Sequence, residues 1–230
     1  MFRPTLRKMT QFDIAIVSDT VCPWCYVGKQ KLEQGIRAYK ERHPDSNDTF
    51  NISWHPFYLD PEAPKVGVDK LAWYHAKMGE ERATASIARL TEVGKSVGIN
   101  FSYGGKIGAT RDSHRIVQLG KTKSLATQNK VIDSLFKSYF EEEGDPTSHE
   151  VLRNVAVRAG LDEKEVDEWL NSDKGGAEVD KEVEEAKRNF ISGVPNFTVQ
   201  GKYEVGGAQD PGVFLRLFEK IKETEGASRV

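Results

Sequence analysis

The sequence predicts an α/β fold in which a long helical insertion interrupts one sheet. Three observations support this prediction. A strand–helix–strand pattern opens the chain, a helical period without a convincing strand runs from about residue 69 to 175, and a strand hairpin followed by a helix closes it. The 230 residues allow one large domain, or one small domain with an insertion. We therefore expect the first and last segments to complete one sheet.

The opening segment has the pattern of two parallel strands joined by a helix. Residues 12–17 are nearly all apolar, as in a strand buried on both faces. A helical pattern follows, with Leu32 on its apolar face, and it is expected to end before Pro44. Residues 49–57 alternate between apolar and polar side chains and predict a second strand. A helical crossover between the two strands would make them parallel.

The middle of the chain carries three apolar stripes at helical spacing, which we expect to be buried in an all-helical domain. Two capping boxes, one from Thr147 to Glu150 and one from Asp162 to Glu165, predict where two of its helices begin. The stripes consist of Leu71, Tyr74 and Met78; Ile132, Leu135, Phe136 and Tyr139; and Leu152, Val155, Ala156 and Ala159.

Strand character returns near the end of the chain. After a charged helical segment, residues 194–199 and 203–205 predict a hairpin around a two-residue turn at Gly201 and Lys202, and a helix follows. The predicted division of the chain is an N-terminal tail (1–11), a first part of the sheet domain (12–66), a helical insertion (67–176) and a second part of the sheet domain (177–230).

Composition and charge exclude several classes of protein. The net charge of −2 lacks the basic excess of a general nucleic-acid binder, and no apolar run reaches the ~18 residues of a membrane span. We expect neither nucleic acid nor a membrane as a partner. The basic N-terminal segment lacks the apolar core of a secretion signal, and a short organellar presequence is an alternative. We predict a cytoplasmic protein.

Both cysteines lie in the motif Cys22-Pro23-Trp24-Cys25, between the first predicted strand and helix. A thiol at a helix N-terminus faces unpaired amide groups and the positive end of the helix dipole, and both favour the reactive thiolate. Pro23 suits the first turn, where its missing N–H costs little. We therefore expect Cys22 to be the exposed, attacking thiol and Cys25 the more buried, resolving thiol.

Three other uses of the cysteines are a zinc half-site, a structural disulfide and inert core packing. Structural zinc requires four ligands, but the five histidines are scattered singly and there is no second cysteine pair. A structural disulfide is typical of secreted chains, and the N-terminal segment of this chain lacks the apolar core of a secretion signal. We expect no metal, flavin or nucleotide cofactor, since a glycine-rich phosphate loop is also absent.

A second unusual element is Gly193-Val194-Pro195, just ahead of the late strand, because proline is normally excluded from central strands. Together with the cysteine motif, this element resembles the DsbA-like thioredoxin superfamily, and within it the FrnE-like group. The resemblance spans residue 12 to about 222 and implies a thioredoxin fold with an inserted all-helical domain. The matching motifs are SDTVCPWCYVG (18–28), GVPNF (193–197) and GGAQ (206–209).

The resemblance implies further site residues. Val194 and Pro195 should be joined by a cis peptide bond beside Cys22, where the Val194 backbone could pair with an extended substrate. The segment containing His114 and Arg115 resembles one that relatives place near the active site, so these two residues are candidate substrate contacts; a solvated or capping turn is the alternative.

Two residues beside the cysteines also have expected roles. Asp19, three residues before Cys22, is a candidate proton relay for Cys25, with a surface or capping role as the alternative. Trp24 stands where DsbA-type oxidants carry a histidine, and it supplies no charge. We therefore expect a less oxidising cysteine pair, and a contribution of Pro23 and Trp24 to the substrate surface.

The predicted function is that of a thiol–disulfide oxidoreductase acting through Cys22 and Cys25 on protein or small-molecule disulfides and thiols, with glutathione as a candidate co-substrate. A reducing compartment would keep the pair as a dithiol. The related kappa-class glutathione transferases and hydroxychromene-carboxylate isomerases carry serine at the nucleophile position, so a glutathione-dependent transferase or isomerase is the second prediction. A redox-inactive, chaperone-like binding module is the third.

Overall fold

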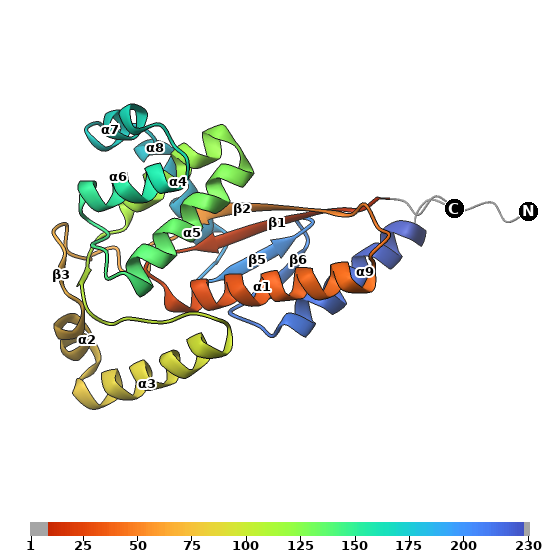
Figure 1. Ribbon diagram of the computed structural model, residues 1–230, viewed down its shortest axis with the longest axis horizontal. Coiled ribbons are helices and arrows are strands. Elements are labelled where there is room, and N and C mark those ends of the chain that lie inside the picture. The colour runs from red at the N-terminus through yellow and green to blue at the C-terminus, as the bar shows by residue number, and fades with distance from the viewer. Residues whose placement is uncertain (1–8, 228–230) are drawn as a thin grey trace, which may run out of the picture.

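A mixed four-stranded sheet forms the centre of the computed structural model (Figure 1), which describes residues 9–227, with side chains up to residue 224. The strand order is β2-β1-β5-β6. The strands are β1 (Gln11–Ser18), β2 (Thr49–Pro56), β5 (Asn196–Val199) and β6 (Tyr203–Gly206). β1 and β2 are parallel, whereas β5 is antiparallel to both β1 and β6. The first and last segments of the chain therefore complete one sheet, as predicted.

Helices α1 (Pro23–Arg42) and α9 (Pro211–Ala227) lie side by side and cover one face of the sheet (Figure 1). Phe12 anchors this layer from β1: its ring stacks on Phe50 at a centroid distance of 4.8 Å and meets Phe218 of α9 at 5.1 Å. The opposite face is more open, because Asp13 of β1 is exposed there. The predicted burial of the first strand on both faces was therefore wrong for its first half.

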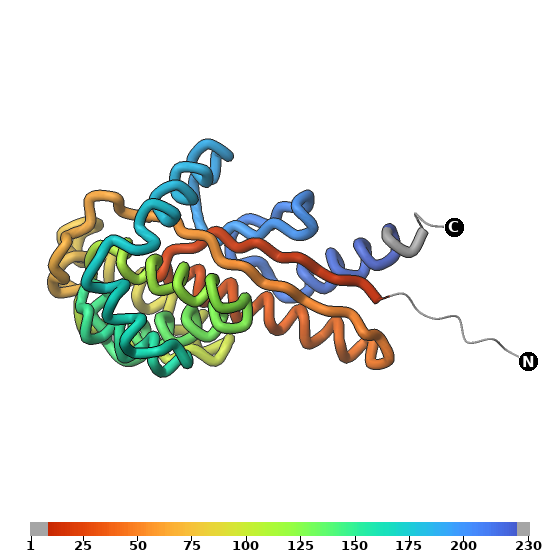
Figure 2. Tube along the Cα trace, turned by 90° about the horizontal axis from the view of Figure 1, so that it is seen from above, coloured from red at the N-terminus to blue at the C-terminus, as the bar shows by residue number. Residues whose placement is uncertain are grey.

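The region between β2 and β5 is helical apart from a small ribbon that the sequence did not predict. The ribbon pairs β3 (Val68–Asp69) with β4 (Lys106–Ile107). Figure 2 shows this region gathered at one end of the sheet, opposite the end where β1 begins and α9 finishes. Its helices are α2 (Lys70–Met78), α3 (Glu80–Ser96), α4 (Arg111–Lys123), α5 (Leu125–Glu141), α6 (His149–Arg158), α7 (Glu163–Leu170) and α8 (Gly176–Arg188).

The stripes predicted for α5 and α6 are buried, but Leu71 and Met78 of α2 are exposed. One predicted cap was also wrong. Ser148, not Thr147, caps α6 by accepting the Val151 N–H, because the Thr147 hydroxyl is bonded to Asp145. The other cap was correct: the Asp162 side chain accepts the Glu165 N–H at the start of α7.

The predicted hairpin forms, but its turn lies one residue earlier than expected. Lys202 N–H donates to the Val199 carbonyl oxygen at 3.1 Å, which makes Gln200 and Gly201 the central residues of the turn. Both have positive φ, 56° and 63°. That geometry matches the twist of the flanking strands, and Gly201 adopts it without a steric cost.

The outer edge of β2 is bonded to side-chain amides of α5. Gln128 accepts the Trp54 N–H at 3.1 Å and donates to the Trp54 carbonyl oxygen at 2.9 Å. The neighbouring Asn129 donates to the carbonyl oxygen of Ile52 and accepts the indole N–H of Trp54. These contacts fix α5 to the sheet.

Asp48, in the loop before β2, joins both ends of the chain. Its side chain accepts hydrogen bonds from Lys222 Nζ at 2.6 and 2.7 Å, from the Tyr39 hydroxyl at 2.7 Å and from the Thr10 N–H at 2.6 Å.

In the described part of the chain, no helix is both long and apolar enough to cross a membrane.

Candidate active site

The cysteine motif lies where β1 leads into α1. Cys22 is the N-cap residue of α1 and Pro23 its first residue, as the sequence predicted. The Cys22 carbonyl oxygen accepts the N–H groups of Cys25 and Tyr26, at 3.0 and 3.4 Å. Both cysteines are free thiols. The expected exposure of Cys22 was wrong: its exposed fraction is 3%, against 0% for Cys25, because the loop at Val194 and the start of α1 cover it. This arrangement places the Cys22 side chain at the start of the helix, with Cys25 behind it.

The surroundings of Cys25 disfavour its thiolate. Burial is the main cause that raises the pKa of Cys25 well above its usual value, and the neighbouring Cys22 sulfur raises it further. The Ser18 hydroxyl and the Asp19 backbone amide oppose this shift in part. Cys25 therefore stays protonated at neutral pH until its environment changes.

We expect iodoacetamide to label Cys22 but not Cys25 at about pH 7, because the thiolate is the form that is alkylated. The pKa of Cys25 is raised, so its thiolate fraction grows only at alkaline pH, and labelling of Cys25 should begin only there. Timed alkylation across a pH series, read by peptide mass mapping, measures both rates. Equal labelling of the two cysteines at neutral pH would contradict this prediction.

The loop before β5 lies against the cysteine motif. The peptide bond between Val194 and Pro195 is cis, as the resemblance implied. The Cys22 thiol donates to the Val194 carbonyl oxygen, with 3.7 Å between sulfur and oxygen. The fold thus joins two segments that are 172 residues apart in the sequence.

Gly28 of α1 allows this loop to pack closely. A Cβ atom at position 28 would lie 2.9 Å from Pro195 Cγ and 3.1 Å from Phe197 Cζ. We expect Gly28→Ala to lower the free energy of unfolding by about 1–3 kcal/mol, as overpacked sites do, and to slow exchange at Cys22 because the loop must move. Urea denaturation and a disulfide-reduction assay measure the two effects. In the control Gly206→Ala the new Cβ meets nothing within 4 Å, and equal effects of the two substitutions would refute the packing argument.

Asp19 lies beneath the motif and is 1% exposed. Its Oδ2 accepts the Leu59 N–H at 2.8 Å. His114 Nε2 lies 3.4 Å from Oδ1 and 3.1 Å from the Phe57 carbonyl oxygen. Through its backbone amide, Asp19 also contacts the Cys25 thiol. The proton-relay role of the carboxylate stays a prediction.

Arg115 is buried, and its contacts favour a structural role over the predicted contact with substrate. Its guanidinium donates to the carbonyl oxygens of Lys174, Trp169 and Ser172, and to the Asp112 carboxylate at 2.8 Å. It therefore ties α4 to the segment between α7 and α8. Neither His114 nor Arg115 lines the cavity beside the cysteine motif.

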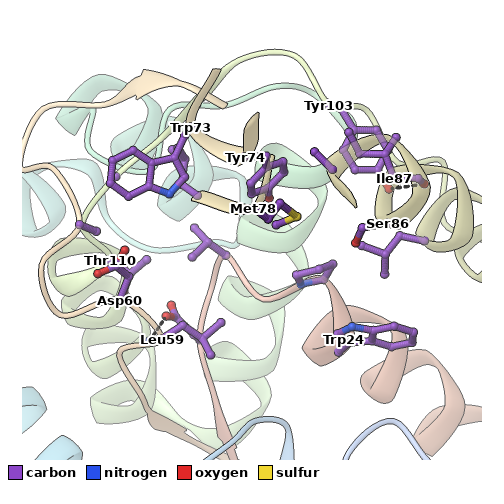
Figure 3. A pocket seen from close by; sticks show the side chains of 18 residues that line it. Trp24, Leu59, Asp60, Trp73, Tyr74, Met78, Ser86, Ile87, Tyr103 and Thr110 are labelled. Carbon is purple, nitrogen blue, oxygen red and sulfur yellow. Dashed lines mark hydrogen bonds between the residues drawn. The ribbon is translucent and has the colours of Figure 1, made fainter. Parts of the chain in front are cut away.

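This cavity has a volume of about 250 Å³ (Figure 3). Val21 and Pro23, the two neighbours of Cys22, form part of its wall, as does Trp24. Figure 3 shows Trp73 and Trp24 on opposite sides of the space, with Tyr74 between them. The remaining wall comes from α2, α3 and the loops beside β3 and β4, and consists of Leu59, Asp60, Ala63, Met78, Ala83, Ser86, Ile87, Leu90, Tyr103, Ile107, Gly108 and Thr110, with Asp19.

Nothing in the sequence indicated this cavity. Tyr74 and Met78 had the spacing of a core stripe, and the structure places them on the cavity wall. Helical spacing identifies the apolar side of α2 but not whether that side meets protein or an open space. Within residues 9–227, no cluster of three or more histidine, cysteine or carboxylate side chains could hold a metal ion.

Comparison with known families identifies the fold. The sequence matches the DSBA-like thioredoxin domain over residues 13–219. The chain belongs to this DsbA-like family. The fold class predicted from the sequence is therefore confirmed, and the structural neighbours are consistent with the FrnE-like branch.

Solved structures of DsbA-like proteins share the fold over most of their length. A probable DsbA oxidoreductase from Streptomyces coelicolor is 29% identical, with a TM-score of 0.79 over 91% of this chain and 89% of its own. A 2-hydroxychromene-2-carboxylate isomerase is 14% identical, with a TM-score of 0.67 over 95% and 100%. The cytosolic disulfide reductase DsbM from Pseudomonas aeruginosa, solved with GSH, is 12% identical, with a TM-score of 0.58 over 90% and 98%. No protein in the set of curated sequences compared with this chain matches it.

Proposed function

We propose that this DsbA-like protein is a thiol–disulfide oxidoreductase whose redox pair is Cys22 and Cys25. The observation that carries the proposal is the position of Cys22, at the N-cap of α1 and 3.7 Å from the Val194 carbonyl oxygen, with the buried Cys25 behind it. A side chain at this place faces the unpaired amide N–H groups of the first helical turn. The Val194 backbone, next to the cis-proline and beside Cys22, is where we expect an extended substrate segment to pair.

The reaction requires no other cofactor. The Cys22 thiolate attacks one sulfur of a substrate disulfide, forming a mixed disulfide and releasing the other sulfur as a thiolate. Cys25 then loses its proton and attacks Cys22, which forms the Cys22–Cys25 disulfide and releases the second substrate thiolate. The two released thiolates take up two protons, and two electrons pass from the cysteine pair to the substrate.

Two further parts of the proposal concern the domains and the compartment. Residues 67–176 act as an insertion domain that supplies much of the cavity wall beside Cys22. The protein works in the cytoplasm as a reductase or isomerase, a proposal that the cytosolic DsbM structure supports by analogy. The motif has a cysteine at both ends. This favours redox chemistry over the transferase and isomerase reactions of relatives that carry serine at the first position.

Equilibration in graded mixtures of reduced and oxidised glutathione tests the proposal, with thiol trapping and intact mass as the readout. We expect one reversible two-electron step that links Cys22 to Cys25. Two thiols that titrate independently and never pair would overturn the proposal. Lasting glutathione adducts without a Cys22–Cys25 disulfide would instead favour a glutathione-dependent transferase or isomerase.

A further inference from the structure

The cavity beside Cys22 is acidic as well as apolar. Asp19 and Asp60 are the two ionisable carboxylates in its wall, and the lining residues that the structure describes include no lysine, arginine or histidine. Aromatic and aliphatic side chains make up most of the remaining wall. A ligand for this cavity should therefore combine an apolar body with a group that a carboxylate can bind.

Asp19 supplies the unsatisfied acceptor. It is 1% exposed, and its Oδ1 has no hydrogen-bond partner within the described part of the chain. His114 Nε2 is 3.4 Å from this oxygen and lies closer to the Phe57 carbonyl oxygen, at 3.1 Å. One hydrogen on Nε2 cannot satisfy both oxygens fully. A buried carboxylate oxygen without a donor is costly, and a ligand with an N–H group would supply one.

Asp60 differs from Asp19 because a cation already neutralises it. Its Oδ2 lies 3.1 Å from Lys77 Nζ, and the same ammonium group lies 4.6 Å from the centre of the Trp73 ring. Asp19 has no equivalent lysine or arginine partner among the ion pairs of the described residues. The negative charge available to a ligand is therefore that of Asp19, at the base of the cysteine motif.

We infer that this cavity binds a cationic side chain, lysine or arginine, that flanks the reacting cysteine of a substrate polypeptide. Its ammonium or guanidinium group donates to Asp19 Oδ1, while its aliphatic stem packs on the apolar wall and its charge lies among aromatic rings. Val21 and Pro23 line the cavity on either side of Cys22, so a residue next to the substrate cysteine is close enough to enter. This inference rests on the proposed function and names its substrate class.

The same charge distribution disfavours ligands that bring carboxylates into the cavity. Glutathione carries two carboxylates, and a glutamate beside a substrate cysteine carries one. Desolvating such a group next to Asp19 has no compensating cation in the lining. Glutathione can still exchange with Cys22 through its sulfur, but we do not expect its carboxylates to occupy this cavity.

Three peptide disulfides test the inference. They are identical except for the residue beside the cysteine, which is lysine, norleucine or glutamate. For the reduced wild-type protein, kcat/KM should be at least about tenfold higher for the lysine peptide than for the glutamate peptide, and the norleucine peptide should lie between them. The order should persist at about 0.5 M NaCl, because salt screens exposed charges far more than buried ones.

Charge-removing variants locate the effect. Asp19→Asn should reduce the ratio of lysine to glutamate rates to near one, whatever it does to the absolute rate. Glu62→Gln removes an exposed charge two residues from Asp60 and outside the cavity lining, so the ratio should stay unchanged in this control. If Asp19→Asn does not fold, the rates of the wild-type protein with the three peptides at low and high salt still test the inference.

Three results would overturn the inference: equal rates for the three peptides, a preference for glutamate, or a lysine preference that disappears in salt. None of them affects the proposed function, which fails if no Cys22–Cys25 disulfide forms in the glutathione titration.

Discussion

Cys25→Ser should accumulate a stable mixed disulfide between Cys22 and a substrate. Cys22→Ser should accumulate none, and its rate of disulfide exchange should fall by about a thousandfold or more, as when a catalytic nucleophile is removed. The asymmetry follows from the structure. Cys22 is at the start of α1, and Cys25 is fully buried behind it with a raised pKa. We therefore expect Cys25 to resolve a disulfide held on Cys22 and not to begin the exchange itself.

Incubation of each variant with a peptide disulfide, followed by non-reducing intact mass spectrometry, measures the trapped species. The wild-type protein is the matched control, and it should show no lasting adduct because Cys25 resolves the mixed disulfide. Adducts on Cys25 in the Cys22→Ser variant at a comparable rate would show that the roles of the two cysteines are reversed or shared.

Asp48→Ala should lower the free energy of unfolding by about 1–3 kcal/mol, the usual cost of removing one partner so that buried or partly buried donors lose their acceptor. The substitution leaves the Lys222 ammonium without this carboxylate and removes the acceptor of the Tyr39 hydroxyl and the Thr10 amide. Urea denaturation measures the change. Glu168→Ala is the control, because the ion pair of Glu168 with Lys174 is more than half exposed on both sides and should contribute less than about 1 kcal/mol.

The pH dependence of the Asp48 effect has a definite sign. Burial alone would raise the pKa of Asp48, but the hydrogen bonds from Lys222, Thr10 and Tyr39 outweigh it and lower the pKa. A carboxylate whose pKa is depressed by folding stabilises the protein above its unfolded pKa of about 4. The difference between wild type and Asp48→Ala should thus be largest near neutral pH and shrink as the pH falls below about 4. A difference that grows in acid would contradict this account.

Local sequence signals predicted the framework of the fold well. The apolar run of β1, the crossover helix and the late hairpin each carry a pattern that depends on neighbouring residues alone, and the cysteine motif adds a strand-to-helix junction. The proximity of Val194 to Cys22 has a different origin. The two residues are 172 positions apart, and only the resemblance to a known family implied that they meet.

Features that depend on tertiary contacts were not predicted. Thr147 had a suitable position for a cap, but Asp145 engages its hydroxyl and the helix begins one residue later. The buried hydrogen bonds from Arg115 to the carbonyl oxygens of Trp169, Ser172 and Lys174 also had no signal in the sequence. The cavity is the clearest case, since Tyr74 looks like a core residue in sequence and becomes a wall residue only when α2 is placed beside the cysteine motif.

The contacts of Gln128 and Asn129 bear on how the protein avoids self-association. A bare edge strand offers its backbone groups to any other extended chain, and that is a common route to aggregation. In β2, α5 side chains already bond the carbonyl oxygen of Ile52 and both backbone groups of Trp54, and Pro56 has no N–H to offer. In the proposed mechanism an extended polypeptide pairs beside Pro195, and the far edge of the same sheet is thus already bonded, which disfavours recruitment of a second copy of the protein there.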